Sequence, residues 1–488
     1  GRMYSTFLAL ETARRALSAH QKAMEVVGHN IANATNPGYV RREAVLEATP
    51  PYVAAPGTSY AKTGAIGTGV EVVKIKRIFD GFLEGRIRDA NVTLGYWEGL
   101  EQILTEIESV FSEPSDVGLG EDLTRFFLAW DNLSSRPEGT PLRAALVEEA
   151  KTLASQVNRI TRNLRRLSSD IDVELAAKVN EINSLTQEIA AQNHEIVKVI
   201  AVGNDPGDLR DKRDVAISRL SRLINMTAFE TEGGAVTIQI GSRDLVREDF
   251  SYELTYVSGS LPGEPLAPDD IETSKILWKR DSMPVDIKGG DLAARLEGRN
   301  ELVPEYYDYI ETFITTTFDE VNKLHRSGFG IDDPRDPGDD GIDFFIYDSE
   351  KRVLRINPAL DPEVGGDLSR IAAASGEHAG DGSIAFAISH LKDELVMEGG
   401  TESIPGFYQN LVARIGVANR NSGHMVQVHE ATHTQCINNK DSVSGVSIDE
   451  ELINLTRYQR AYQAASRFFT VVDEMLDTII NGTGIVGR

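Results

Sequence analysis

The chain has 488 residues, of which 41% are hydrophobic and 26% are charged, a composition typical of folded globular proteins with two to four domains. Its 75 acidic and 50 basic residues give a formal net charge of −25, which argues against nucleic acid or an anionic membrane surface as the main partner. The one cysteine, Cys436, excludes an intramolecular disulfide, and no run of about 18 apolar residues predicts membrane insertion.

Apolar residues at the start of the chain repeat every seven positions, as they do along the seam of a coiled coil. The repeat comprises Met3, Leu10, Leu17, Met24 and Ile31. This spacing predicts a helix about 48 Å long at ~1.5 Å per residue. Because the helical pattern begins at once, we predict no cleaved secretory signal at this end.

The segment NIANATNPGYVRR, residues 30–42, predicts a corner at which the first helix stops. Pro37 cannot continue a helix, and Gly38 can adopt a positive φ. The amide side chains before them are expected to hydrogen-bond the last helical carbonyls and the neighbouring turns. The basic and aromatic residues after them are free to contact another helix or subunit, including the acidic residues 449–451. The corner residues of this hypothesis are Asn30, Asn33, Pro37, Gly38, Tyr39, Arg41 and Arg42.

The middle of the chain alternates helical patterns with two segments of strand character. Helical stripes predict helices over about 97–111, 142–201, 208–225, 290–326 and 405–440. The longest of them contains a four-residue phase slip at Leu175, which unwinds a supercoil locally without ending the helix. Residues 226–289 alternate apolar and polar side chains as strands do, and residues 331–398 contain two further short strands.

We therefore expect a mainly α, multi-domain protein with β inserts, built as an elongated rod of long coiled-coil and bundle helices with paired termini. The predicted domains are a terminal coiled coil (3–45 with 446–488), an extended connector with short strands (46–95), a helical bundle (96–225, 290–330 and 399–445), a β-rich insert (226–289) and a small mixed insert (331–398).

The stretch HEATH, residues 429–433, matches the zinc-peptidase pattern H-E-x-x-H. Its candidate ligands are His429 and His433, with Cys436 one turn further on. These three residues share the helical stripe expected to face the bundle, where a catalytic zinc would have no open position, and no histidine follows to complete the site. We therefore expect core histidines, no metal and no cofactor, and keep a zinc metallopeptidase only as a distant alternative.

A second seven-residue repeat runs from Ile448 to Leu476 near the end of the chain. Narrow seams at both ends predict that the two terminal helices pair with each other. Alanine, methionine and leucine on such seams bury more surface between neighbouring subunits than on one isolated helix pair, so we expect the ends to be mobile until assembly orders them. The predicted assembly seam comprises Leu10, Leu17, Met24, Ile31, Leu455, Tyr462, Phe469 and Leu476.

Two long segments together resemble the terminal signatures of the axial proteins of the bacterial flagellum, the rod, hook and hook-associated proteins. These are HNIANATNPGYVRREA at 29–44 and SGVSIDEELINLTRYQRAYQAASRFFTVVDEMLDTIIN at 444–481. The segments NPGYVRR, SVSGVSIDEEL, DLRDKRD at 208–214 and EVNKLHRSGFG at 320–330 are most similar to the hook-associated type that joins hook to filament. The resemblance is weak over both inserts.

The resemblance implies a non-catalytic structural subunit that self-assembles through its terminal helices into a short helical zone. Its implied partners are further copies of itself, the hook protein, the adjacent junction protein toward the filament and an export chaperone on the C-terminal helix. It implies extracellular placement at the hook–filament junction, reached through the flagellar type III export apparatus. Another axial subunit, of hook or rod type, is the main alternative.

Overall fold

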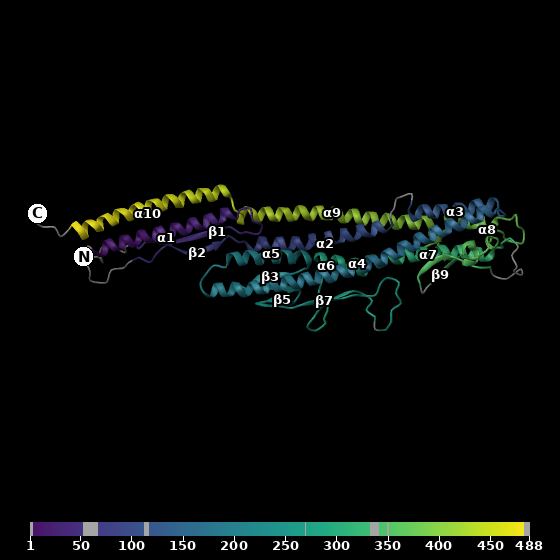
Figure 1. The fold of residues 1–488 in the computed structure, drawn as a ribbon, viewed down its shortest axis with the longest axis horizontal. Helices are drawn as coiled ribbons and strands as arrows, with labels where there is room; N and C mark the ends of the chain where they lie inside the picture. Colours follow the sequence, from purple (N-terminus) through teal and green to yellow (C-terminus); the bar gives the residue numbers. More distant parts are fainter. Residues whose placement is uncertain are drawn as a thin grey trace.

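The protein is an elongated rod in which long helices run lengthwise and short β elements lie along one side (Figure 1). The computed structural model describes residues 3–51, 67–111, 117–268, 270–331, 341–348 and 351–482, with side chains from Phe7 onward. The first and last helices lie together at one end of the rod (Figure 1). The expected mainly helical, multi-domain architecture with paired termini is therefore confirmed.

The terminal module consists of two long helices and a two-stranded sheet. Helix α1 (Met3–Ala32) lies beside α10 (Ile448–Gly482), and β1 (Arg42–Ala48) pairs antiparallel with β2 (Val70–Arg77). Both strands also contact α1, so this helix is covered on two sides. Residues 52–66 of the predicted connector lie outside the described residues.

The helical body is built around one large apolar core, with a small separate cluster of Leu100, Leu104 and Ala294 beside it. Its helices are α2 (Gly81–Phe111), α3 (Leu119–Ser135), α4 (Thr140–Ala201), α5 (Gly207–Leu223), α6 (Gly290–Glu297), α7 (Val303–Ser327), α8 (Ser383–His390) and α9 (Ile404–Ser444). Helix α4 remains helical for 62 residues, through the predicted phase slip at Leu175, which is fully buried. The predicted helices therefore exist, with ends that differ by a few residues.

Several stretches differ from the sequence-based expectation. Helices α3 and α8 were not among the predicted helices. Residues 81–95, predicted as part of an extended connector, form the first half of α2. Polar residues at buried positions, Glu84 and Asn91, break the apolar stripe that would otherwise have indicated a helix there. The predicted helix 290–326 is interrupted by a π-helical turn over Gly298–Leu302 that joins α6 to α7.

The two inserts form small antiparallel sheets against the body, as their alternating patterns predicted. In the first insert, β3 (Thr227–Glu230), β4 (Val236–Ile240), β5 (Arg243–Arg247) and β6 (Phe250–Ser251) form a sheet in sequential order, and β7 (Leu254–Val257) pairs with β8 (Lys275–Trp278). In the second, β9 (Phe345–Asp348) pairs with β10 (Val353–Ile356), and β11 (Leu395–Met397) pairs with β12 (Glu402–Ser403), which lies just beyond the predicted end of the insert. Residues 332–340 and 349–350 of this insert lie outside the described part.

Asparagine side chains on the helices attach these strands to the body. Asn193 of α4 donates through Nδ2 to the Val236 carbonyl (2.8 Å) and accepts the Val236 N–H through Oδ1 (2.9 Å). One carboxamide thus replaces a neighbouring strand and satisfies both backbone groups of one residue. The same pairing joins Asn158 to Leu354, Asn183 to Leu254, and Asn322 to Phe345.

Candidate assembly interface and its joint to the helical body

The predicted seam of α10 lies on the face that is buried within this chain. Leu476 is buried, whereas Leu455, Tyr462 and Phe469 are half-buried. Leu455 packs on a small apolar cluster that α1, β1 and α10 share. The predicted register of α10 is therefore the one that faces its intramolecular partner α1.

On α1, the residues of the predicted repeat are not the most deeply buried ones. Leu10, Leu17, Met24 and Ile31 are all half-buried. The fully buried residues are Ala13, Ala19, Ala23, Val26, Val27 and Asn30. This difference follows from the position of α1 between α10 and the β1–β2 hairpin, because a second buried face moves the centre of burial away from a single seam.

A second apolar stripe on α10 is exposed. Phe468, Val471 and Met475 have 46%, 46% and 51% of their surface accessible, and their spacing places them on one face of the helix. Leu452 and Ile453 are exposed near the start of the same helix. Exposed large apolar side chains that form a contiguous stripe are characteristic of surfaces that bind another protein.

Asn30 is the centre of the corner and has no exposed surface. Its Nδ2 donates to the Arg42 carbonyl (2.8 Å) and to Glu451 Oε2 (3.1 Å), and its Oδ1 accepts the Arg42 N–H (3.0 Å). Asn30 therefore joins α1, β1 and α10 and does not cap the helix as predicted. Asn33 does cap it, because its Nδ2 donates to the His29 carbonyl (3.0 Å).

The remaining corner residues bring the chain against α5 and α10. Gly38 has φ +84°, a conformation that favours glycine. A Cβ at this position would also collide with Val215 of α5, so both the backbone conformation and the available space require glycine. The Tyr39 hydroxyl donates to Asn30 Oδ1 (2.7 Å), and burial raises the pKa of Tyr39 to about 12. Arg41 forms the predicted ion pair with the start of α10, to Glu450 at 3.5 Å.

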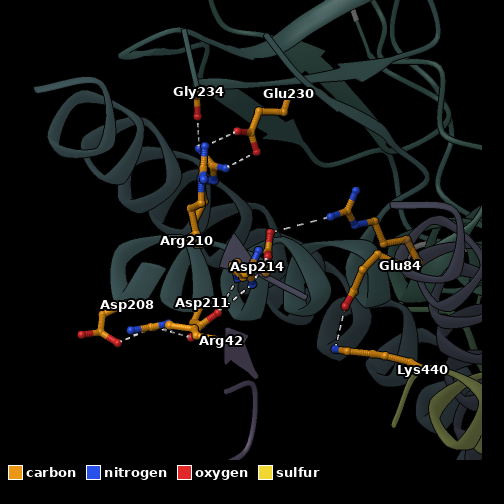
Figure 2. Close-up of polar contacts among 12 residues, drawn as sticks. Arg42, Glu84, Asp208, Arg210, Asp211, Asp214, Glu230, Gly234 and Lys440 are labelled. Atoms are coloured by element: carbon orange, nitrogen blue, oxygen red, sulfur yellow. Dashed lines mark hydrogen bonds and ion pairs between the residues drawn. The ribbon is translucent and has the colours of Figure 1, made fainter. Parts of the chain in front are cut away.

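Arg42 does not pair with the acidic start of α10 but with α5, where it opens a row of alternating charges (Figure 2). Its Nη2 donates to Asp208 (2.6 Å) and to Asp211 (3.1 Å). Arg77 of β2 binds Asp211 (2.8 Å from Nε) and Asp214 (2.7 Å from Nη2). Arg88 of α2 lies 3.8 Å from Asp214. We call these residues the charge ladder: Asp208, Arg42, Asp211, Arg77, Asp214 and Arg88.

The ladder is well shielded from solvent in its middle. The Arg77 side chain is 8% exposed and that of Asp211 11%. Burial raises the pKa of the Asp211 carboxyl, and the charges of Arg77 and Arg42 oppose that rise. At Asp208, burial also raises the pKa, but the hydrogen bond and charge of Arg42 outweigh it, so that the pKa is lowered overall.

Other ion pairs flank the ladder in Figure 2. Lys440 of α9 binds the buried Glu84 of α2 at 2.7 Å, and Arg210 of α5 binds Glu230 of β3 at 2.8 Å. In sequence, the segment DLRDKRD at 208–214 was evident only as part of the family resemblance. Its signal was the spacing of Asp208, Asp211 and Asp214, which puts three carboxylates on one face of a helix.

The HEATH stretch packs between helices and forms no recognisable metal site. Within the described ranges, no group of three or more His, Cys, Asp or Glu side chains is placed to hold a metal ion. The His429 ring stacks on Trp97 of α2 with centroids 6.4 Å apart, and Cys436 is buried. Burial lowers the pKa of His433, and the nearby Arg222 lowers it further. His429 and His433 are half-buried and are not the core histidines expected from the sequence, whereas Cys436 is buried.

Three family models match the chain. Residues 104–345 match the helical domain of the flagellar hook-associated protein FlgK. Residues 10–39 match the flagella basal body rod protein family, and residues 441–482 match the flagellar basal body rod FlgEFG protein C-terminal family. The two rod-type matches fall on the paired terminal helices, and the FlgK match falls on the body.

Similar full-length proteins carry consistent names. Flagellar hook-associated protein 1 of Bacillus subtilis (strain 168) is 28% identical, with all of both chains covered. Flagellar hook-associated protein 1 of Escherichia coli (strain K12) is 24% identical over 97% of this chain and 99% of that protein. In fold, the flagellar hook junction protein FlgK from Burkholderia pseudomallei matches 75% of this chain and all of that one, with a TM-score of 0.61 at 15% identity.

Proposed function

We propose a structural, non-catalytic role at the hook–filament junction for this chain, which belongs to the family of the flagellar hook-associated protein FlgK. Its subunits would assemble through the terminal module into a short helical zone. The proposed partners are other copies of the chain, the hook protein and the adjacent junction protein toward the filament. None of the described helices is long and apolar enough to cross a membrane.

The observation that carries this proposal is the pair of apolar stripes on α10. One stripe includes the buried Leu476 and Leu455, which packs on the cluster shared with α1, and the other, with Phe468 and Met475, is exposed. A monomer gains nothing from exposing three large apolar side chains on one helical face. We infer that the seam holds the terminal module together and that the exposed stripe contacts the next subunit.

The test is Phe468→Asp combined with Met475→Asp, made in the gene on the chromosome. A charge on an exposed stripe leaves the folded monomer intact, but it has to be desolvated when subunits pack, so filaments should fail to form on existing hooks. Electron microscopy of the cells measures filaments per hook. Gln463→Asp, on another exposed face of α10, is the matched control and should leave filaments normal.

Export needs a separate measurement, because we also propose that the flagellar type III apparatus carries the chain out and that an export chaperone binds α10. The amount of variant protein in the culture medium measures export. Normal export with bare hooks supports the proposal. Normal filaments on cells that carry the double variant would refute the exposed stripe as the subunit contact.

A further inference from the structure

The attachment of the terminal module to the body depends on few contacts. The two parts are joined covalently where β2 runs into α2 and where α9 runs into α10. Between them, the apolar cluster of the module does not merge with the core of the body. The contacts that cross the boundary include the corner turn at Gly38 and the two arginines that the open end of the hairpin presents to α5.

The two arginines are held in fixed positions relative to each other. Arg42 and Arg77 are directly paired in the register of β1 and β2, so one sheet position presents both guanidinium groups. Asp208, Asp211 and Asp214 recur every three residues on α5, which sets carboxylates at matching intervals along one helical face. Each of the two arginines bridges two aspartates, and Asp211 is shared by both.

A second, independent feature, a glycine at the start of α5, favours the same contact. Gly207 begins α5, and a Cβ at this position would lie 2.7 Å from Cζ and Nε of Arg42. The absence of a side chain lets the Arg42 guanidinium lie directly against the first turn of α5. Arg42 also stacks over the Tyr39 ring with its Cζ 5.2 Å from the centroid, so its position is fixed from the other side.

We propose that the charge ladder sets the orientation of the terminal module relative to the helical body, and that a subunit must hold this orientation to join the assembly. Charge-assisted hydrogen bonds from a planar guanidinium group to two carboxylates define an orientation better than an apolar contact of the same size, since each bond constrains both a distance and a direction. The ladder residues are positioning residues, and the contact with the next subunit is left to α10. The assembly half of this inference rests on the proposed function.

The orientation is tested on the purified chain with two spin labels, at Lys74→Cys on β2 and Ser184→Cys on α4, in a Cys436→Ser background. Both label sites are exposed. Pulsed electron spin resonance should give one narrow distance peak. Asp211→Asn, which keeps the shape but removes the charge shared by two arginines, should broaden or shift this peak. An unchanged distance distribution would overturn the proposal.

Two further variants serve as an alternative to Asp211→Asn and as its control. Gly207→Ala preserves all six charges and displaces Arg42, so it should also broaden the peak, and it replaces Asp211→Asn if that variant fails to fold. Asp89→Asn makes the same chemical change at an exposed position of α2 beside Arg88 and should leave the peak narrow. Broadening by Asp89→Asn equal to that by Asp211→Asn would contradict a specific ladder.

The link to assembly is measured separately from the proposed function. Cells carrying Asp211→Asn should export the protein normally and show a loss of filaments per hook. A broadened distance peak together with normal filament number would overturn the assembly half of the inference and leave the joint itself intact. A different result, normal filaments on cells that carry the Phe468→Asp and Met475→Asp double variant, would contradict the proposed function.

Discussion

The terminal module and the helical body differ in how completely their apolar residues are buried. The body surrounds α4 with helices and strands, so that most of its buried apolar residues form one large core. The module has a small separate cluster, with few fully buried residues on α10 and a second apolar stripe left uncovered. Since burial of apolar area is the main stabilising contribution, we expect the body to be the more stable part and the module to gain stability when another surface covers its exposed stripe.

Hydrogen exchange of the free protein should show this difference most strongly. We expect amides in the middle of α4 to open only when the whole body unfolds, and those of α10 to open when one helix pair separates. We expect protection factors in α4 to exceed those in the second half of α10 by at least about two orders of magnitude, which corresponds to ~3 kcal/mol. Equal protection in a verified monomer would contradict the comparison between the two regions.

The same mutation in the two regions should differ in its effect on stability. Leu164 of α4 has no exposed surface, whereas Leu455 of α10 is half-buried. Leu164→Ala removes a fully packed side chain and should lower the free energy of unfolding by about 2–5 kcal/mol. Leu455→Ala should cost about 1 kcal/mol or less. Urea titrations followed by circular dichroism measure both, and a larger loss for Leu455→Ala would reverse the ranking of the two regions.

A smaller effect is expected from His20, whose ring lies 6.3 Å from that of Tyr458 across the α1–α10 contact. Burial lowers the pKa of His20 below its ordinary value of 6.5. The folded module thus prefers neutral His20, so its contribution to stability is complete above that pH and is lost as the pH falls through 6.5 and then through the lower folded value.

Exchange of α10 amides measured across this pH range, corrected for the intrinsic rate, should therefore accelerate relative to α4 as the pH falls. His20→Gln should remove most of the acceleration, because glutamine does not titrate. An undiminished acceleration in His20→Gln would assign the pH dependence to another group.

Periodicity alone was enough to predict most of the helices and the pairing of the termini. A helix must keep one face apolar at a spacing of three to four residues, and that requirement is written into the order of the residues. It predicted α4 through its phase slip and the register of α10 that faces α1. It failed over 81–95, where Glu84 and Asn91 occupy buried positions of α2, because a polar residue satisfied by a distant partner cannot be distinguished in sequence from an exposed one.

The contacts of the candidate site also include some that the sequence predicted and some that it did not. The sequence indicated a corner at Pro37 and Gly38, and an arginine contact with the acidic start of α10, which Arg41 makes. The sequence did not predict the partners of Asn30 and Arg42. Asn30 pairs with the strand that follows it and with Glu451, and Arg42 pairs with α5, because the hairpin folds back over the body.

What the sequence determined by itself is therefore the set of long helices, the strand character of the inserts and the corner, since all of these depend on neighbours within a few turns of chain. What only the tertiary structure decided is which polar side chains meet. Asp208 and Arg42 are separated by 166 positions and Asn158 and Leu354 by 196. A hydrogen bond or ion pair between such residues requires a specific distance and direction, and these are set by the packing of whole helices and strands, which no local pattern records.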